Sequence, residues 1–249
     1  MYLLNHHSKI GPSTVMATLS NLVKRQLGWV VLSLLLTLTW SFAGALQPVL
    51  AHRPHDVVTQ VKLSPSYSSD KTLYSLVRGN LFKSTDAGNS WKRIVQGLDT
   101  LTPFSTLTID QAQGQVLAMG TYGDGIFRSD DQGESWQQSN EGLDTLDIGV
   151  VYSLPSDAQV MLAAGTNGGL SRSTDGGQTW FSVVDASQTF SVITEAEDTL
   201  WAGDETGLLL SSNNGGQSWQ SLLTVADDSI TALAGNSQVL YVGTASKGV

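Results

Sequence analysis

The hydrophobic positions after residue 52 fall in short runs, and segments rich in glycine and polar residues separate them. An apolar, β-branched run such as "FSTLTID" is followed by a second run that contains a glycine turn, such as "VLAMGTYGDGIFRS". Short runs bounded by Gly, Asn and Asp predict strands joined by tight turns. No apolar period of 3.6 residues is sustained in this region, so we expect almost no helix there.

A unit of about 40 residues is repeated along the chain. Its most visible marker is a tryptophan, found at 91, 136, 180 and 219 and therefore at spacings of 45, 44 and 39 residues. Repeats of this length are typical of propellers, whose blades are four-stranded sheets. We predict an all-β fold, a β-propeller with blades at about 56–98, 102–143, 148–186 and 189–226 and an incomplete blade at 228–249.

The last predicted blade lacks its second half. The segment "VLYVGTASKGV" aligns with "VLAMGTYGDGI", but it ends at Val249 without a tryptophan. We therefore expect about four and a half blades, which leaves a ring open and a sheet edge exposed. We interpret the chain as a fragment or a truncated gene product, with closure by a partner chain as the alternative.

Each tryptophan ends a short phrase: "KSTDAGNSW", "RSDDQGESW", "RSTDGGQTW" and "SSNNGGQSW". In a tight turn, a short carboxylate can accept backbone N–H groups, and glycine supplies a positive φ. We predict a structural turn once per blade, formed by Ser84, Asp86, Gly88, Ser90, Trp91, Ser129, Asp131, Gly133, Ser135, Trp136, Ser173, Asp175, Gly177, Thr179, Trp180, Ser212, Asn214, Gly216, Ser218 and Trp219.

A catalytic or metal-binding use of the phrase is the alternative. Its spacing does not match the calcium-loop pattern. In addition, Asn214 replaces the aspartate in the fourth copy, and an amide is neither a general base nor a charged ligand. We expect no catalytic residue, no metal and no cofactor in these phrases.

The four phrases resemble the Asp-box, or BNR, repeats of sialidase-like β-propellers over residues 56–249. The stretch "LSPSYSSDKTLYSLVRGNLFKSTDAGNSW" is similar to exported bacterial propellers described as glycosyl hydrolase-like or photosystem II assembly-factor-like. The resemblance implies the propeller fold. It does not by itself imply one function, because this fold carries several.

The residues that sialidase chemistry would need are not found. The Phe-Arg-Ile-Pro motif of that family is absent from the sequence, and Tyr152 has no evident glutamate partner. Lys83, Arg128 and Arg172 each precede one of the phrases, so we interpret them as one repeated strand position and not as a trio that holds a substrate carboxylate.

The first 51 residues have the pattern of an export signal. Lys24 and Arg25 precede an apolar stretch from Leu27 to about Leu46, and small residues follow. We predict cleavage after Ala51, with an uncleaved membrane anchor as the alternative. Either way, the rest of the chain crosses the membrane, to a periplasm, lumen or extracellular space.

Charge excludes one class of partner. Residues 52–249 hold 10 basic and 22 acidic residues, and binding to a phosphate backbone needs clustered Lys and Arg. We expect no nucleic acid partner. The chain has no cysteine, so disulfides and thiolate chemistry are excluded.

The predicted turns between second and third strands could form a ligand face. Their polar residues are Arg78, Tyr122, Asp124, Asp204 and Glu205. Two facing carboxylates there could perform glycosidase chemistry. The alternative, which we favour, is that these are solvated turn residues.

Together these features predict an exported, non-catalytic binding or assembly module with a protein or glycan partner, used in the assembly of a membrane complex of the photosystem type. The alternative is a glycoside hydrolase with part of its site in further blades.

Overall fold

The computed structural model describes residues 57–98, 103–225, 227–236 and 238–248. The predicted export signal, its cleavage point and the anchor alternative lie outside the described residues. Strands dominate the described part, as expected from the sequence. A four-residue helix, α2 (Tyr67–Asp70), lies between the first two strands. Among the described residues, no helix is long and apolar enough to cross a membrane.

The strands form four four-stranded antiparallel sheets and one pair, each built from consecutive strands. The first sheet contains β1 (Val58–Leu63), β2 (Leu73–Val77), β3 (Asn80–Ser84) and β4 (Lys92–Arg93), and the second contains β5 (Phe104–Ile109), β6 (Leu117–Thr121), β7 (Ile126–Ser129) and β8 (Gln137–Gln138). The third contains β9 (Ile148–Ser153), β10 (Met161–Gly165), β11 (Leu170–Ser173) and β12 (Phe181–Val184). The fourth contains β13 (Val192–Ala196), β14 (Thr199–Gly203), β15 (Leu208–Ser212) and β16 (Gln220–Thr224), and the pair is β17 (Ile230–Gly235) with β18 (Leu240–Thr244).

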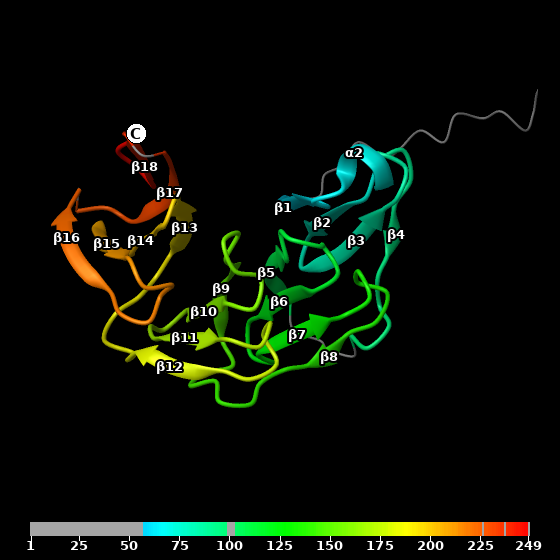
Figure 1. Ribbon diagram of the computed structural model, residues 1–249, viewed down its shortest axis with the longest axis horizontal. Coiled ribbons are helices and arrows are strands. Elements are labelled where there is room, and N and C mark those ends of the chain that lie inside the picture. The colour runs from blue at the N-terminus through cyan, green and yellow to red at the C-terminus, as the bar shows by residue number, and fades with distance from the viewer. Residues whose placement is uncertain (1–56, 99–102, 226, 237, 249) are drawn as a thin grey trace, which may run out of the picture. The chain divides into compact units, whose positions relative to one another are not determined.

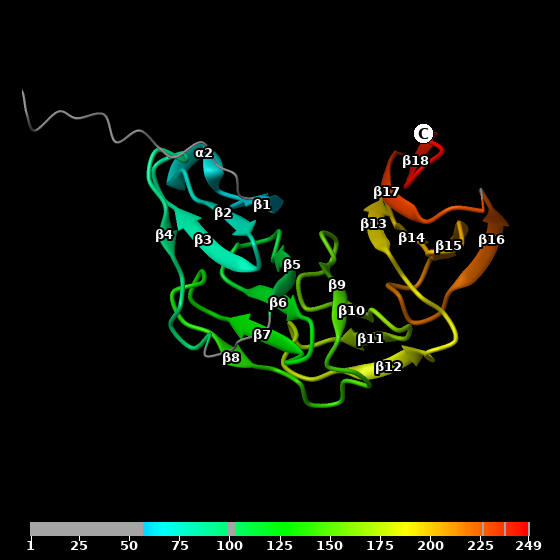
Figure 2. The ribbon, with the colours of Figure 1, turned by 180° about the vertical axis from the view of Figure 1, so that it is seen from behind.

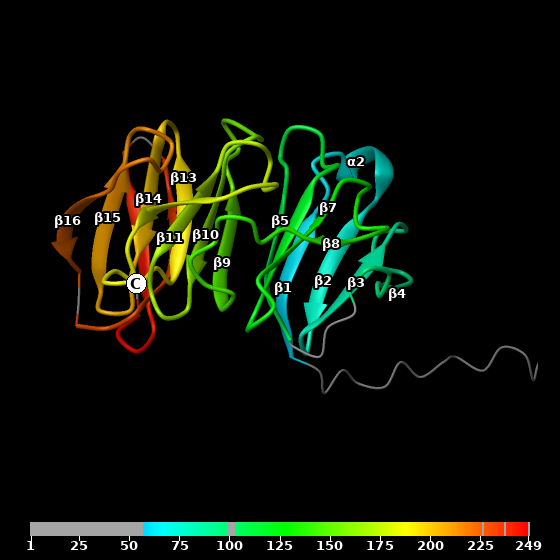
Figure 3. The same ribbon diagram turned by 90° about the horizontal axis from the view of Figure 1, so that it is seen from below.

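The sheets follow one another in chain order. The first strands β1, β5, β9, β13 and β17 lie innermost, and the fourth strands β4, β8, β12 and β16 lie outermost (Figures 1 and 2). Seen from below, neighbouring sheets stand face to face (Figure 3). This arrangement is an incomplete β-propeller with four complete blades and half of a fifth, which confirms the predicted fold.

The core lies between successive sheets. Strand β6 is buried along its whole length, as a strand covered on both faces should be. One cluster joins Tyr74 and Leu76 of the first sheet to Leu107, Leu117 and Phe127 of the second. A corresponding cluster joins the third sheet to the fourth. Each sheet therefore obtains its stability from its neighbours.

Glycine allows neighbouring sheets to approach closely at two positions, Gly120 and Gly203. A Cβ atom on Gly120 of β6 would lie 2.7 Å from Ile148 Cγ2 on β9 and 2.9 Å from Thr106 Cγ2 on β5. Gly203 of β14 meets Ile230 of β17 in the same way, at 2.4 Å. The missing side chain at this position of the second strand makes room for the first strand of the next sheet.

Side chains also connect the innermost strands. Gln60 Oε1 accepts a hydrogen bond from the Leu107 N–H at 2.7 Å, and Thr108 Oγ1 accepts one from the Ser153 N–H at 3.0 Å. The Tyr152 hydroxyl accepts one from the Glu195 N–H at 2.9 Å. Tyr152, for which the sequence suggests no partner, is therefore part of the connection between the third and fourth sheets.

Candidate functional site

The four repeated phrases form turns between the third and fourth strands, which we call box turns: Ser84–Trp91, Ser129–Trp136, Ser173–Trp180 and Ser212–Trp219. In the second box turn, the Ser129 hydroxyl donates to Asp131 Oδ1 at 2.8 Å and accepts from the Gly133 N–H at 2.8 Å. Gly133 has a φ of +80°, the left-handed conformation that glycine adopts readily. The same bonds recur in the other three turns.

The aspartates are occupied by these internal hydrogen bonds. Asp131 accepts from the Ser135 N–H at 2.9 Å and from the Ser135 hydroxyl at 2.6 Å. In Asp86, the hydroxyl of Ser90, its N–H and the Ser84 hydroxyl lower the pKa to about 2. In Asp131 and Asp175, burial opposes ionisation, but the hydrogen bonds together outweigh it and lower each pKa to about 2. Carboxylates of this kind stay ionised and cannot act as general acids near neutral pH.

The amide in the fourth box turn keeps the same geometry. Asn214 Oδ1 accepts from the Ser212 hydroxyl at 2.9 Å and from the Ser218 N–H at 3.0 Å. Its Nδ2 donates to the Ser218 hydroxyl at 2.8 Å, so only the direction of that bond is reversed. The position therefore requires an acceptor for turn groups and does not require a charge.

The tryptophans differ in exposure along the chain. Trp136 and Trp180 are 5% and 4% exposed, whereas Trp91 in the first sheet is 43% exposed. Trp180 Nε1 donates to the Ser139 carbonyl of the preceding sheet at 3.0 Å. A Cβ atom on Gly97 would lie 1.9 Å from the Trp136 carbonyl oxygen, and Gly142 meets Trp180 equally closely. Gly97 and Gly142, which occupy equivalent places after the fourth strands of the first two sheets, thus contact the next box turn.

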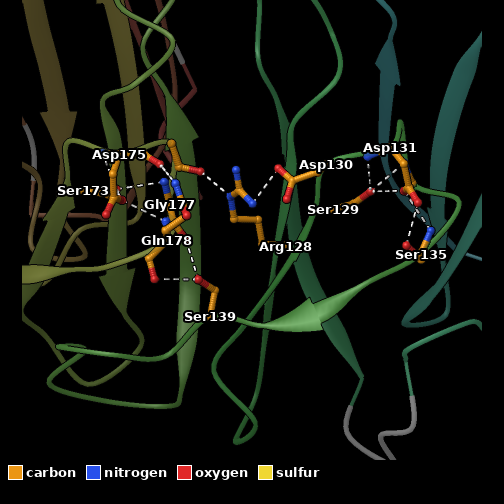
Figure 4. Close-up of polar contacts among 12 residues, drawn as sticks. Arg128, Ser129, Asp130, Asp131, Ser135, Ser139, Ser173, Asp175, Gly177 and Gln178 are labelled. Atoms are coloured by element: carbon orange, nitrogen blue, oxygen red, sulfur yellow. Dashed lines mark hydrogen bonds and ion pairs between the residues drawn. The ribbon is translucent and has the colours of Figure 1, made fainter.

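A basic residue precedes each of the first three box turns and reaches into the box turn of the next sheet. Lys83 Nζ donates to the Gln132 carbonyl at 2.9 Å, Arg128 Nε to Gly176 at 2.6 Å, and Arg172 Nε to Gly215 at 2.7 Å. Figure 4 shows Arg128 between its own turn and the third one. These cross-sheet contacts join each sheet to a backbone carbonyl in the box turn of the next sheet.

The counter-ions of the three basic residues differ. Lys83 pairs with Glu134 of the next sheet at 2.6 Å, and Arg128 pairs with Asp130 beside its own turn at 2.6 Å. In the part of the chain that the structure describes, Arg172 has no carboxylate within 4 Å. Burial lowers the pKa of Arg172, and the charge of Asp157 raises it.

The predicted ligand-face residues lie in the expected turns but in different surroundings. Arg78, Tyr122 and Glu205 are exposed and Asp124 is half-buried. Asp204 is 3% exposed and accepts hydrogen bonds from the Thr206 and Leu208 N–H groups at 2.8 and 2.7 Å. Asp124 is in the second sheet, and Asp204 and Glu205 are in the fourth, so the third sheet separates these carboxylates.

Cavities lie at the box turns and outer strands of the described residues. One has a volume of about 380 Å³ and lies between β8, the residues that follow it and the third box turn. Cavities of about 150 and 270 Å³ lie beside Arg128 and beside Lys83. No ligand-binding residue is predicted from the sequence in this region. Among the described residues, no group of three or more His, Cys, Asp or Glu could hold a metal ion.

Comparison with known proteins shows the fold of this chain but does not assign the chain to a family. No family model matches the chain, and no curated protein matches its sequence. Among solved structures, YCF48 bound to D1 peptide is similar over 77% of this chain, with a TM-score of 0.59 and 13% identity, and YCF48 from Cyanidioschyzon merolae over 76%, with a TM-score of 0.57 and 14% identity. This chain spans 63% and 64% of those two chains.

The third similar structure is an enzyme. It is the GH74 xyloglucanase from Xanthomonas campestris, similar over 76% of this chain and 34% of its own, with a TM-score of 0.62 and 16% identity. At these identities the likeness shows the β-propeller fold alone, and the fold occurs in a glycoside hydrolase as well as in a protein bound to a peptide.

Proposed function

We propose that this chain is part of an exported Asp-box β-propeller that acts as a non-catalytic binding or assembly module. The observation that carries the proposal is the likeness to YCF48 bound to D1 peptide, a propeller that holds a protein segment. The proposed partner is accordingly a segment of another protein.

The local chemistry supports a module. The aspartates of the box turns accept hydrogen bonds from their own turns. Asp204 likewise accepts hydrogen bonds from residues of its own turn. The repeated hydrogen-bond pattern is the reason for assigning the turns to the Asp-box type.

The proposed location and process rest on the sequence. The basic and apolar pattern of residues 1–51 favours export, so the partner would be met in a periplasm, a lumen or outside the cell. Together with the resemblance to assembly-factor-like propellers, this favours a role in the assembly of a membrane complex.

A binding measurement tests the proposal. The D1 peptide, carrying a fluorophore, is titrated with the purified chain, and anisotropy is followed against a scrambled peptide of equal charge. We expect saturable binding of the D1 peptide that is at least tenfold tighter than binding of the scrambled one. Equal affinity for the two peptides would overturn the proposed partner class.

The alternative function is a glycoside hydrolase, favoured by the TM-score of 0.62 with the GH74 xyloglucanase. The same preparation is incubated with xyloglucan, and release of reducing ends is measured. Release above a heat-denatured control would support the hydrolase in place of the module.

A further inference from the structure

A side-chain connection between the innermost strands recurs at two joints between neighbouring sheets. Where the second sheet meets the third, Thr108 Oγ1 accepts a hydrogen bond from the Ser153 N–H at 3.0 Å. Where the third meets the fourth, the Tyr152 hydroxyl accepts one from the Glu195 N–H at 2.9 Å. In both cases a side chain of one innermost strand is the acceptor for a backbone donor of the next. An acceptor is therefore expected at the same place where the first sheet meets the second.

Lys62 of β1 occupies that place in the first sheet. Lys62, Thr108 and Tyr152 share one register position, because each pairs with a second-strand residue that in turn pairs with the basic residue before a box turn. The lysine ammonium has three donors and no acceptor, so Lys62 cannot make the bond that the other two residues make. Departures from a local rule are expected at functional positions.

The side chain of Gln60 shows which backbone donor lies beside Lys62. Gln60 and Lys62 are two residues apart on β1, so their side chains leave the same face of the strand. Gln60 Oε1 accepts a hydrogen bond from the Leu107 N–H of the second sheet at 2.7 Å. The same offset between the two strands places Lys62 beside Ile109, two residues after Leu107.

The N–H of Ile109 points away from its own sheet. The Asp110 N–H donates to the Val116 carbonyl at 2.9 Å within the second sheet, and successive donors of a strand point to opposite edges. The Ile109 carbonyl, on the same edge as its N–H, accepts a hydrogen bond from the Gln111 amide at 3.0 Å. Ile109 is 1% exposed, and no acceptor for its N–H is found among the described residues. A buried backbone donor without an acceptor is costly.

The ammonium of Lys62 also lacks an acceptor. Lys62 is half-buried and has no ion pair or hydrogen bond with any other described residue. Burial lowers its pKa, and no neighbouring charge in the described part of the chain opposes this effect. The joint between the first and second sheets therefore holds two donors, one of them charged, and lacks the acceptor that the next two joints have.

We propose that the carboxylate group of a ligand binds at this joint, with one oxygen accepting from the Lys62 ammonium and the other from the Ile109 N–H. The two oxygens match two donors, and the single negative charge balances the single positive one. The carboxylate belongs either to a free organic acid or to the end of a peptide chain. This inference goes beyond the proposed function and does not require a protein partner.

Nitrogen–proton correlation NMR on the purified full chain follows the Ile109 amide directly. The probes are acetate, as a free organic acid, and N-acetylglycine, as the end of a peptide, with chloride and phosphate at equal ionic strength. We expect both carboxylates to shift the Ile109 signal saturably, at least threefold further than chloride does. At least threefold tighter binding of N-acetylglycine identifies a peptide end as the source, and equal or weaker binding identifies a free acid. No saturable shift with either carboxylate, or tighter binding of phosphate, overturns the proposal.

Variants of two lysines in the first sheet assign the binding to Lys62. Lys62→Thr gives the Ile109 N–H the acceptor that Thr108 provides at the next joint, so we expect at least tenfold weaker acetate binding and a urea midpoint that does not fall. Lys92, whose side chain is 76% exposed, is the matched control, and Lys92→Thr should keep the acetate affinity within twofold.

Three results on these variants would contradict the site: unchanged acetate affinity in Lys62→Thr, an equal loss in both variants, or a lower urea midpoint in Lys62→Thr, which would reveal a structural partner of the lysine. Binding of the D1 peptide to the unmodified chain reports separately on the proposed function, so the two proposals can fail independently.

Discussion

The third box turn shows what a single residue contributes to a blade. Asp175 accepts hydrogen bonds from the Ser173 hydroxyl, from the N–H groups of Gln178 and Thr179 and from the Thr179 hydroxyl, at 2.6–3.0 Å. Asn214 performs the same task in the fourth turn. Hydrogen-bond acceptance and not charge is thus the property that this position needs.

We therefore expect Asp175→Ala to destabilise the protein by about 1–2 kcal/mol, because several turn donors lose their acceptor next to solvent. Asp175→Asn should cost less than half as much, since the amide can adopt the arrangement of Asn214. Urea unfolding followed by tryptophan fluorescence measures both. Equal losses in the two variants would show that the charge itself matters.

The box turns also predict a response to acid. The pKa values of Asp86, Asp131 and Asp175 are lowered from 3.8 to about 2 in the folded chain. Groups with a lowered folded pKa contribute stability above the unfolded value, and this contribution is lost as the pH falls through the folded value. We expect stability to decline between about pH 4 and pH 2, with a smaller slope in Asp175→Asn. Urea midpoints measured across this range check the prediction, and identical slopes would contradict it.

At the level of strands and turns, the cross-sheet contacts join each blade to the next. Arg128 and Arg172 make the same bond to a box-turn carbonyl and are buried to the same degree. Within the described residues, Arg128 has a carboxylate partner, Asp130, and Arg172 has none. The Asp130 side chain is 58% exposed, so removing Arg128 leaves a carboxylate that water solvates, and the pair itself adds little stability.

Arg128→Met and Arg172→Met should therefore destabilise the protein by similar amounts, about 1–3 kcal/mol, because each leaves a box-turn carbonyl without its donor. The loss in Arg128→Met should exceed the other by at most about 1 kcal/mol. Methionine retains the apolar stem, so the comparison isolates the charged end. Differential scanning calorimetry of the two variants gives the order. A larger loss in Arg172→Met would mean that its charge has a partner outside the described residues.

The close approach of sheets at glycine gives a second prediction at this level. A methyl group on Gly120 would collide with Ile148 and Thr106, both buried, so Gly120→Ala should destabilise by about 1–3 kcal/mol through overpacking. In Gly149→Ala the nearest atom is at 3.3 Å, and the loss should be smaller. Urea unfolding of the pair measures the difference.

At the level of the whole molecule, the sequence predicted what is local and repeated. The strands, the box turns and the common position of Lys83, Arg128 and Arg172 all follow from patterns within one unit. The carbonyl that each basic residue binds lies in the next unit, and no pattern within one unit shows which groups of the next unit it can contact. The burial of Asp204 and the cavity beside Ser139 were missed for the same reason, because both depend on packing between sheets.

The described contacts couple each sheet chiefly to its neighbours, as in repeat proteins. We expect amide hydrogens of the second and third sheets, which are covered on both faces, to exchange more slowly than those of the β17–β18 pair. Hydrogen exchange followed by mass spectrometry resolves the sheets as separate peptides. Uniform protection across the sheets would show that the molecule opens only as one unit.

The three basic residues before the box turns all bind groups that come later in the chain. Lys83, Arg128 and Arg172 bind carbonyls that lie 49, 48 and 43 residues later in the sequence. During synthesis from the N-terminus, each of these cations therefore emerges from the ribosome one blade before the carbonyl that it binds. A newly made blade keeps an unsatisfied cation until the following blade is in place, so we expect folding to follow translation with a delay of one repeat.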